Sequence, residues 1–243
     1  MMLKDLNKNT VSKSARKHLV VIGDSFCSSP EGWPGHLANQ LNLNLINFGD
    51  PGAHWWTQLY FLENEIPEED KENIEVIVFC HTEMNRMPTR NREVTKVNRM
   101  NQKFFGNEVD KAVELYYKHI SDWKFLDWAQ NKWFEEIGQK WSHIPKIVHL
   151  HSFPWSWEKR ELLKGMNVWP SLAALALNEV DAKGSNEIPI TTPNHFNNDN
   201  NWILAKEVKR LIDDYSESDV EFNVSEFKQM TDRWLDWEKA TSE

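Results

Sequence analysis

The chain has 243 residues, of which 40% are hydrophobic and 27% are charged, and its net charge is −9. This length and composition are typical of a globular protein with one sizeable core. Because binding to duplex nucleic acid normally requires a basic surface, the acidic balance disfavours nucleic acid as a partner. No run reaches the ~18 apolar residues of a membrane span, so no membrane segment is expected.

The first 17 residues form a polar, locally basic segment that we expect to be a flexible tail. This segment lacks the continuous apolar stretch of a secretory signal, which favours a cytoplasmic protein or one otherwise without a classical signal peptide. The two cysteines, Cys27 and Cys80, are too few for a disulfide framework and suit a reducing compartment. We expect both to be packed in the interior.

Short apolar runs alternate with helix-like patterns along the first part of the chain. Four such runs predict β-strands, over 18–23, 43–48, 74–80 and 146–151. Helices are expected over 37–41, after Pro34-Gly35, and over 54–64. Strands separated by helices connect by right-handed crossovers, so the pattern predicts a parallel sheet with helices on both faces.

Three further segments complete the predicted organisation. Residues 84–141 are expected to form a helical insertion or lid, because apolar residues recur at helical steps from 109 to 137 and basic residues, including Arg86, precede them. Residues 154–170, rich in Trp and Pro, predict a long loop. An amphipathic helix is expected over 220–240. The predicted division is therefore a tail over 1–17, a domain over 18–215 and a C-terminal helical segment over 216–243.

The turn Gly23-Asp24-Ser25 follows the first apolar run and is the first candidate for chemistry. Glycine permits a tight turn there, and the Asp24 carboxylate can bond to neighbouring backbone and hold the loop. The Ser25 hydroxyl would then project at the edge of the sheet, where backbone amides can bind a developing oxyanion. The alternative is that Asp24 and Ser25 only cap or turn the chain.

Two other stretches strengthen the catalytic interpretation. The turn that ends at Gly52, after the second strand, offers a second backbone amide at the same sheet edge. His195 precedes the helix-like run 202–212, where a histidine is well placed to act as a general base. In a parallel sheet, the loop that carries Ser25 and the loop that carries His195 can meet at the carboxyl edge of the strands.

These motifs together resemble the SGNH, or GDSL-type, hydrolase superfamily. The matching stretches are Gly-Asp-Ser at 23–25, Asn-Phe-Gly-Asp-Pro-Gly at 47–52 and Asn-His-Phe before an apolar helix at 194–205. The resemblance implies a flavodoxin-like, three-layer α/β/α fold and an ester hydrolase that uses no cofactor and no metal. It implies that Ser25 is the nucleophile, that His195 is the base, and that the backbone of Ser25 and Gly52 supplies oxyanion donors.

The sequence departs from the family pattern at two positions. Where the family has an asparagine that completes the oxyanion hole, this chain has Glu83, and Asn85 lies two residues later as a substitute third donor. Where the family has the triad aspartate, three residues before the histidine, this chain has Thr192. A Ser-His dyad or an incomplete triad is the expected arrangement, with Asp24 and Thr192 in supporting roles.

Thirteen tryptophans suggest how a substrate could be held. Trp55, Trp56, Trp155 and Trp157 are candidate substrate-binding residues, and a small-molecule or glycan ester is the expected substrate, which would make the protein a carbohydrate O-acetylesterase. The same residues also suit an alternative, a catalytically impaired module that binds a glycan through a Trp-rich cleft. A third interpretation is an assembly protein that uses its C-terminal helix as a contact. The oligomeric state is left open.

Histidines also gather at predicted strand ends. His149 and His151 lie on one face of a strand, and His81 ends the neighbouring one. A transition-metal site is the less favoured interpretation of this cluster, because no recognised ligand spacing supports it. Buried, hydrogen-bonded histidines beside an active site are the favoured one.

Overall fold

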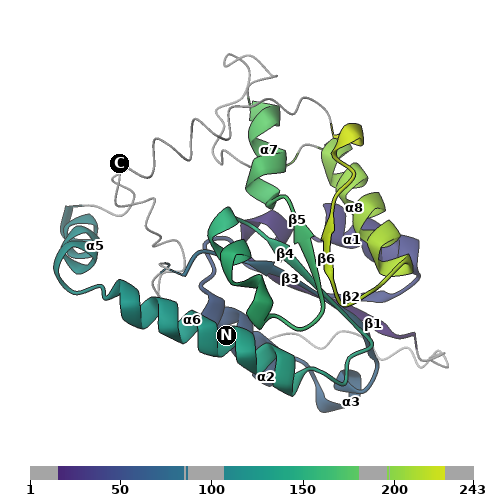
Figure 1. The fold of residues 1–243 in the computed structure, drawn as a ribbon, viewed down its shortest axis with the longest axis horizontal. Coiled ribbons are helices and arrows are strands. Elements are labelled where there is room, and N and C mark those ends of the chain that lie inside the picture. The colour runs from purple at the N-terminus through teal and green to yellow at the C-terminus, as the bar shows by residue number, and fades with distance from the viewer. Residues whose placement is uncertain (1–15, 85, 87–106, 181–195, 197, 228–243) are drawn as a thin grey trace, which may run out of the picture.

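The computed structural model of the protein describes residues 16–84, 86, 107–180, 196 and 198–227. Within them, six strands form one sheet in the order β2-β1-β3-β4-β5-β6, and every neighbouring pair is parallel (Figure 1). The strands are β1 (His18–Gly23), β2 (Asn44–Gly49), β3 (Ile74–His81), β4 (Lys146–His151), β5 (Met166–Trp169) and β6 (Asp219–Glu221). The first five strands follow the flavodoxin-like order 2-1-3-4-5.

Helices cover both faces of this sheet. They are α1 (Trp33–Leu41), α2 (Trp55–Asn64), α3 (Glu68–Lys71), α5 (Asn107–His119), α6 (Trp123–Lys140), α7 (Leu172–Val180) and α8 (Asn198–Asp213). The core on one face joins the sheet to α1, α7 and α8, and the core on the other joins it to α2 and α6. The predicted three-layer α/β/α fold is confirmed, and it is the fold that the resemblance to the SGNH superfamily implies.

The strands are apolar on both sides because both sides are covered. In β1, Leu19 and Val21 face the core beneath α1 and α8, whereas Val20 and Ile22 face the core beneath α2 and α6. All four side chains are fully buried. Burial of one such side chain contributes about 1.5–3 kcal/mol, so this central strand is a firm base for the turn that follows it.

The helical stripe over 109–137 is divided between two helices, α5 and α6. Asp122 caps the start of α6, because its carboxylate accepts hydrogen bonds from the backbone amides of Lys124 and Phe125. One face of α6 packs against the sheet and buries Trp133, Phe134 and Ile137. Helices therefore lie where the insertion was predicted, while its role as a lid stays a prediction; residues 87–106 lie outside the described part.

The prediction of a loop over 154–170 is wrong. A 3-10 helix, η2 (Pro154–Leu162), occupies the first half, and β5 follows it. Only three residue pairs connect β5 to β4. So short a strand shows too little periodicity to be seen in the sequence, and it exists because its backbone pairs with strands on both sides.

The predicted C-terminal helix is also wrong over its first part. The chain forms β6 and then a 3-10 turn, η4 (Val224–Glu226), instead of a helix beginning at 220. Phe222 and Phe227, whose spacing suggested a helix, both insert into the core beside α8. Their spacing therefore reflects burial and not a helical face. Residues 228–243 lie outside the described part of the chain.

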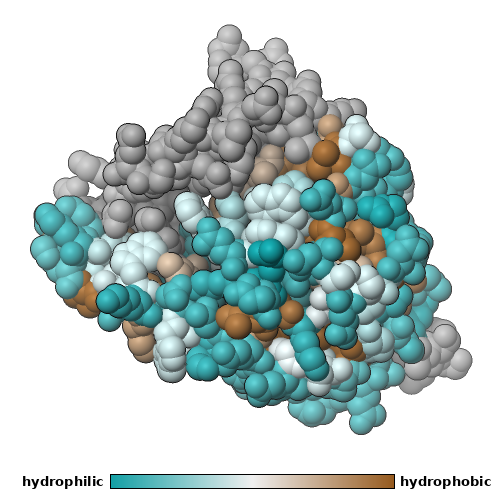
Figure 2. Space-filling view, in the orientation of Figure 1, coloured by the Kyte–Doolittle hydropathy of each residue, from teal (hydrophilic) through white to brown (hydrophobic). Residues whose placement is uncertain are grey.

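The surface seen in Figure 2 is largely hydrophilic, with hydrophobic residues in separate small areas. No helix within the described ranges combines the length and apolarity that crossing a membrane requires.

Candidate active site

The serine turn lies directly beyond β1, and Asp24 is its anchor. Ser25 begins a 3-10 helix, η1 (Ser25–Cys27), and Asp24 caps that helix by accepting a hydrogen bond from the Phe26 amide at 3.1 Å. The same carboxylate oxygen accepts a hydrogen bond from the Ser152 hydroxyl at 3.0 Å. Asp24 is fully buried, whereas Ser25 is half-buried. Asp24 therefore holds the backbone of this turn through hydrogen bonds, and its supporting role in catalysis stays a prediction.

Gly23 is required by close packing. A Cβ atom at Gly23 would lie 2.5 Å from Cys80 Cβ and 2.9 Å from Cys27 Sγ, which no side chain can tolerate. From the sequence, glycine was expected at position 23 because it permits a tight turn. In the structure, glycine is needed there because β3 approaches too closely for any side chain. Cys27 and Cys80 are free, buried thiols, and burial holds the pKa of Cys80 well above its ordinary value.

The second turn is tied to the first by backbone and side-chain contacts. The Asp50 amide donates to Gly23 O at 3.2 Å, and the Asn47 side chain donates to Cys27 O at 3.0 Å. Gly52 has a φ of 74°, a left-handed conformation that glycine adopts at no steric cost. The turns that carry Ser25 and Gly52 therefore follow neighbouring strands and share hydrogen bonds.

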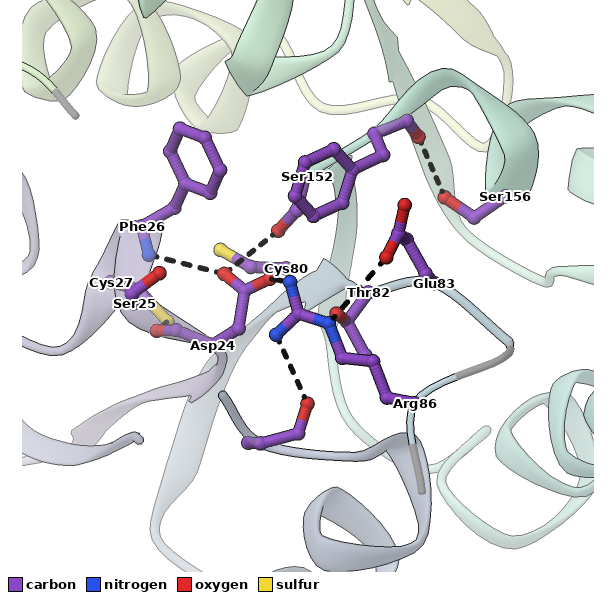
Figure 3. Close-up of polar contacts among 12 residues, drawn as sticks. Asp24, Ser25, Phe26, Cys27, Cys80, Thr82, Glu83, Arg86, Ser152 and Ser156 are labelled. Atoms are coloured by element: carbon purple, nitrogen blue, oxygen red, sulfur yellow. Dashed lines mark hydrogen bonds and ion pairs between the residues drawn. The ribbon is translucent and has the colours of Figure 1, made fainter. Parts of the chain in front are cut away.

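Arg86 lies at the centre of the loops beyond β1 to β4 (Figure 3). Its guanidinium forms an ion pair with Asp24 Oδ2 at 3.3 Å and another with Glu83 Oε2 at 4.0 Å. It donates a hydrogen bond to Ala53 O at 3.3 Å and lies 5.3 Å from the centre of the Phe153 ring. Arg86 and Glu83 are both buried. One arginine thus contacts residues from the loops after four adjacent strands.

Phe196, which follows His195 in sequence, lies beside the serine turn. The rings of Phe26 and Phe196 are 6.0 Å apart, and these residues immediately follow Ser25 and His195 in the chain. Asn201, on α8, donates to Phe196 O at 3.1 Å and accepts from the Trp33 amide at 2.9 Å. His195 itself lies outside the described residues, as do Asn85 and Thr192.

Three buried histidines form a stack on the α6 side of the sheet, and two of them, His81 and His149, are hydrogen-bonded to each other. His149 Nε2 lies 2.9 Å from Lys164 O, which can only accept, so Nε2 carries the proton. His149 Nδ1 then accepts from His81 Nε2, also at 2.9 Å. His151 Nδ1 lies 2.8 Å from the hydroxyl of Ser156, which itself donates to a backbone carbonyl. The complete burial of the three rings favours their neutral form.

These histidines are poor proton acceptors. Burial lowers the pKa of His149 to about 4, and burial together with the neighbouring rings holds the pKa values of His81 and His151 well below the ordinary 6.5. His54, which precedes α2, has a pKa lowered to about 3 by burial and by the charge of Arg86. Its Nδ1 already accepts the Trp56 amide at 3.0 Å.

The histidine stack was the less favoured candidate for a metal centre. Among the described residues, no group of three or more His, Cys, Asp or Glu side chains is placed to hold a metal ion.

The candidate substrate-binding tryptophans differ in exposure. Trp55 is 1% exposed and belongs to the core beneath α2, so its ring is not offered at the described surface. Trp56 stacks on it at 4.3 Å and is 45% exposed. Trp155 is 37% exposed, while the half-buried Trp157 lies under the Arg160 guanidinium at 4.5 Å. Trp56 and Trp155 are the two that a ligand could reach.

Sequence reasoning overlooked Arg86 and Ser152 as individual site residues. Arg86 was visible only as one of several basic residues in a polar stretch. Ser152 follows β4 directly, which is the position where a parallel sheet presents functional side chains, and that signal could have identified it.

Comparison with known proteins adds little to this geometry. No family model matches the chain, and no curated protein shows a significant match. Among solved structures, the chain is similar to a protein described as a "putative lipolytic protein of G-D-S-L family" from Desulfitobacterium hafniense DCB-2. That match has 12% sequence identity and a TM-score of 0.43, and covers 80% of this chain and 99% of the other.

Proposed function

We propose that the protein is a serine ester hydrolase in which Ser25 is the nucleophile and His195 is the general base. Ser25 Oγ would attack the acyl carbonyl while His195 accepts the serine proton, and collapse of the intermediate would expel the alcohol, to which His195 gives that proton. His195 would then activate a water molecule that releases the acid. The proposal includes no cofactor, and Thr192 would leave the pair as a dyad or an incomplete triad.

The contact between Phe26 and Phe196 carries this proposal. A ring separation of 6.0 Å between the residues that follow Ser25 and His195 favours a short distance between the two proposed catalytic groups. The four buried histidines favour His195 as well. Their lowered pKa values or occupied ring nitrogens make them unsuited to accept the serine proton near neutral pH.

The oxyanion would be held by the backbone amides of Ser25 and Gly52, with Asn85 as a third donor. The hydrogen bonds between the two turns support this arrangement, because they hold neighbouring amides at one sheet edge. Removal of one such donor typically lowers the rate about 10²–10³-fold. If Asn85 does not reach the oxyanion, a low turnover of this order is expected.

For the substrate, we propose a small-molecule or glycan ester, with an O-acetylated carbohydrate as the favoured class. Trp56 and Trp155 follow β2 and β4, and they expose the aromatic surface on which a sugar ring can stack. Acetylated and deacetylated forms of one oligosaccharide would test this class directly. Release of acetate with saturation kinetics supports it, whereas activity on p-nitrophenyl acetate alone restricts the substrate to small esters.

The decisive experiment is covalent labelling of Ser25. The protein is treated with a fluorophosphonate, the modified residue is located by mass spectrometry, and hydrolysis of p-nitrophenyl acetate is followed in parallel. Ser25→Ala should abolish both signals. Ser29→Ala is a matched control, because Ser29 is an exposed serine of the same loop and should leave both unchanged. Full activity in Ser25→Ala contradicts the assignment.

A binding module is the second candidate. Two buried carboxylates, Asp24 and Glu83, lie beside the serine turn, and negative charge there opposes an oxyanion. If neither a Ser25 adduct nor turnover is found, binding of acetylated oligosaccharides to the protein and to a Trp56→Ala variant, measured by calorimetry, tests this alternative.

A further inference from the structure

The Asp24 carboxylate fixes the shape of the serine turn, and that carboxylate is an unusual group to bury. It lies at 0% exposure and accepts hydrogen bonds from Phe26 N and Ser152 Oγ through Oδ1. A buried carboxylate is tolerated only when hydrogen bonds and an opposite charge compensate for its lost hydration. Both hydrogen bonds are made to Oδ1, so the lost hydration of Oδ2 must be compensated by another group.

Arg86 supplies that compensation. Its Nη2 lies 3.3 Å from Asp24 Oδ2, and its side chain is only 7% exposed, so solvent screens the pair weakly. Within the described part of the chain, Arg86 also contacts Glu83 Oε2, at the longer distance of 4.0 Å. The guanidinium is itself held by Ala53 O and by the Phe153 ring. Among the described residues, the shortest ion pair of Arg86 is therefore with Asp24, the residue that caps η1 (Figure 3).

We propose that Arg86 is a positioning residue: by holding the Asp24 carboxylate in place, it fixes the turn that presents Ser25. Arg86 acts on the turn through Asp24 and does not bind substrate. Because the same guanidinium contacts the loops after β2, β3 and β4, it fixes Ser25 relative to the turn of Gly52. The expected effect of Arg86 on the rate of ester hydrolysis rests on the proposed function. Its expected effect on the stability of the serine turn does not.

The test therefore begins with a measurement that needs no substrate. The amide of Phe26 donates to Asp24, so its hydrogen exchange reports directly on the capped turn. In Arg86→Met, we expect this amide to exchange about tenfold faster or more, the scale of one lost charge-assisted contact. The amides of Val20 and Val21, inside β1, should keep their protection. An unchanged Phe26 amide in Arg86→Met overturns the proposal.

Two further variants separate the charge of Arg86 from its other contacts. Arg86→Lys keeps a cation for Asp24 and should restore part of the lost protection, which also provides a readout if Arg86→Met does not fold. Glu83→Gln removes the more distant carboxylate and should leave Phe26 protected. If Glu83→Gln loosens Phe26 as much as Arg86→Met does, or if Arg86→Lys restores nothing, the contact with Asp24 is not the operative one.

Arg210→Met is the matched control. Arg210 on α8 also pairs with a carboxylate, Glu207, at 3.0 Å, but it lies in another part of the fold. This variant should leave Phe26 exchange unchanged. A Phe26 amide that loosens equally in Arg210→Met reports general destabilisation and contradicts a specific role for Arg86.

Kinetics then test the effect on the reaction. In Arg86→Met, kcat for ester hydrolysis should fall about tenfold or more while KM stays within about twofold, because the lost group orients the nucleophile and does not contact substrate. Arg86→Lys should recover part of kcat. A rise in KM with unchanged kcat overturns the positioning role. If the wild-type protein hydrolyses no ester, the proposed function fails, and the exchange results still decide the role of Arg86.

Discussion

Acidification should destabilise this protein through its buried histidine stack. His81, His149 and His151 are neutral and fully enclosed in the fold, and burial lowers their pKa values, that of His149 to about 4. In the unfolded chain each would have the ordinary pKa of about 6.5. The unfolded state therefore takes up protons that the folded state refuses, and folding stability falls as the pH decreases from about 6.5 toward 4.

The magnitude follows from this difference. At pH 5, one histidine that stays neutral in the fold but is protonated when unfolded costs about 2 kcal/mol, since each pH unit corresponds to 1.36 kcal/mol. Protonation of His81 and His151 in the unfolded chain adds to this loss in the same direction. A typical free energy of unfolding is only about 5–15 kcal/mol, so the loss from His149 alone is a measurable fraction of the stability at pH 5. Above pH 6.5 the stack contributes its full stability.

Urea unfolding followed by tryptophan fluorescence measures this dependence. In wild type, we expect the free energy of unfolding to fall steeply between pH 6.5 and 5. His149→Gln retains one donor and one acceptor, so its slope should be smaller by about 1.4 kcal/mol per pH unit, the contribution of one proton. His143→Gln, at an exposed position, is the control and should follow wild type. A flat profile in wild type, or an unchanged slope in His149→Gln, would refute the reasoning.

Three other substitutions test how the serine turn is built. In Gly49→Ala, the new Cβ would lie 2.2 Å from Cys27 O, so we expect a loss of about 1–3 kcal/mol or more in urea unfolding, together with slower labelling of Ser25; wild-type behaviour would contradict the packing argument. Ser152→Ala removes a hydrogen bond to the buried Asp24 carboxylate and should lower the free energy of unfolding by about 1–3 kcal/mol, whereas an unchanged urea midpoint would indicate that water replaces the hydroxyl. Asn201→Ala removes the acceptor for the first amide of α1 and should cost about 1 kcal/mol, measured as a lower thermal midpoint; no shift would show that this contact adds nothing.

Within the fold, the longer strands could be predicted from the sequence and the shortest ones could not. Strands β1, β3 and β4 were predicted within one residue of their bounds, because each has six to eight residues and most of them are apolar, which is characteristic of strands buried on both faces. Strands β5 and β6 have four and three residues and were missed. Their residues form strands because neighbouring backbones pair with them, which no local pattern reveals.

Within the candidate site, the outcome depended on whether a role was local. Asp24 bonds to an amide two residues away, and the sequence predicted that role from the residue type alone. Arg86 contacts groups 3, 33 and 62 positions away in the chain, at Glu83, Ala53 and Asp24. A basic residue in a polar stretch could pair with many carboxylates, so its partner could not be predicted.

The sequence by itself determined the parallel α/β organisation and the place of the serine turn, because both depend on patterns within a few consecutive residues. Only the tertiary structure decided which distant residues surround that turn. It placed Phe196 against Phe26, the Ser152 hydroxyl on Asp24, and the charge of Arg86 between two buried carboxylates. The physical reason is that these contacts join the ends of separate strands, and their geometry exists only once the sheet has assembled.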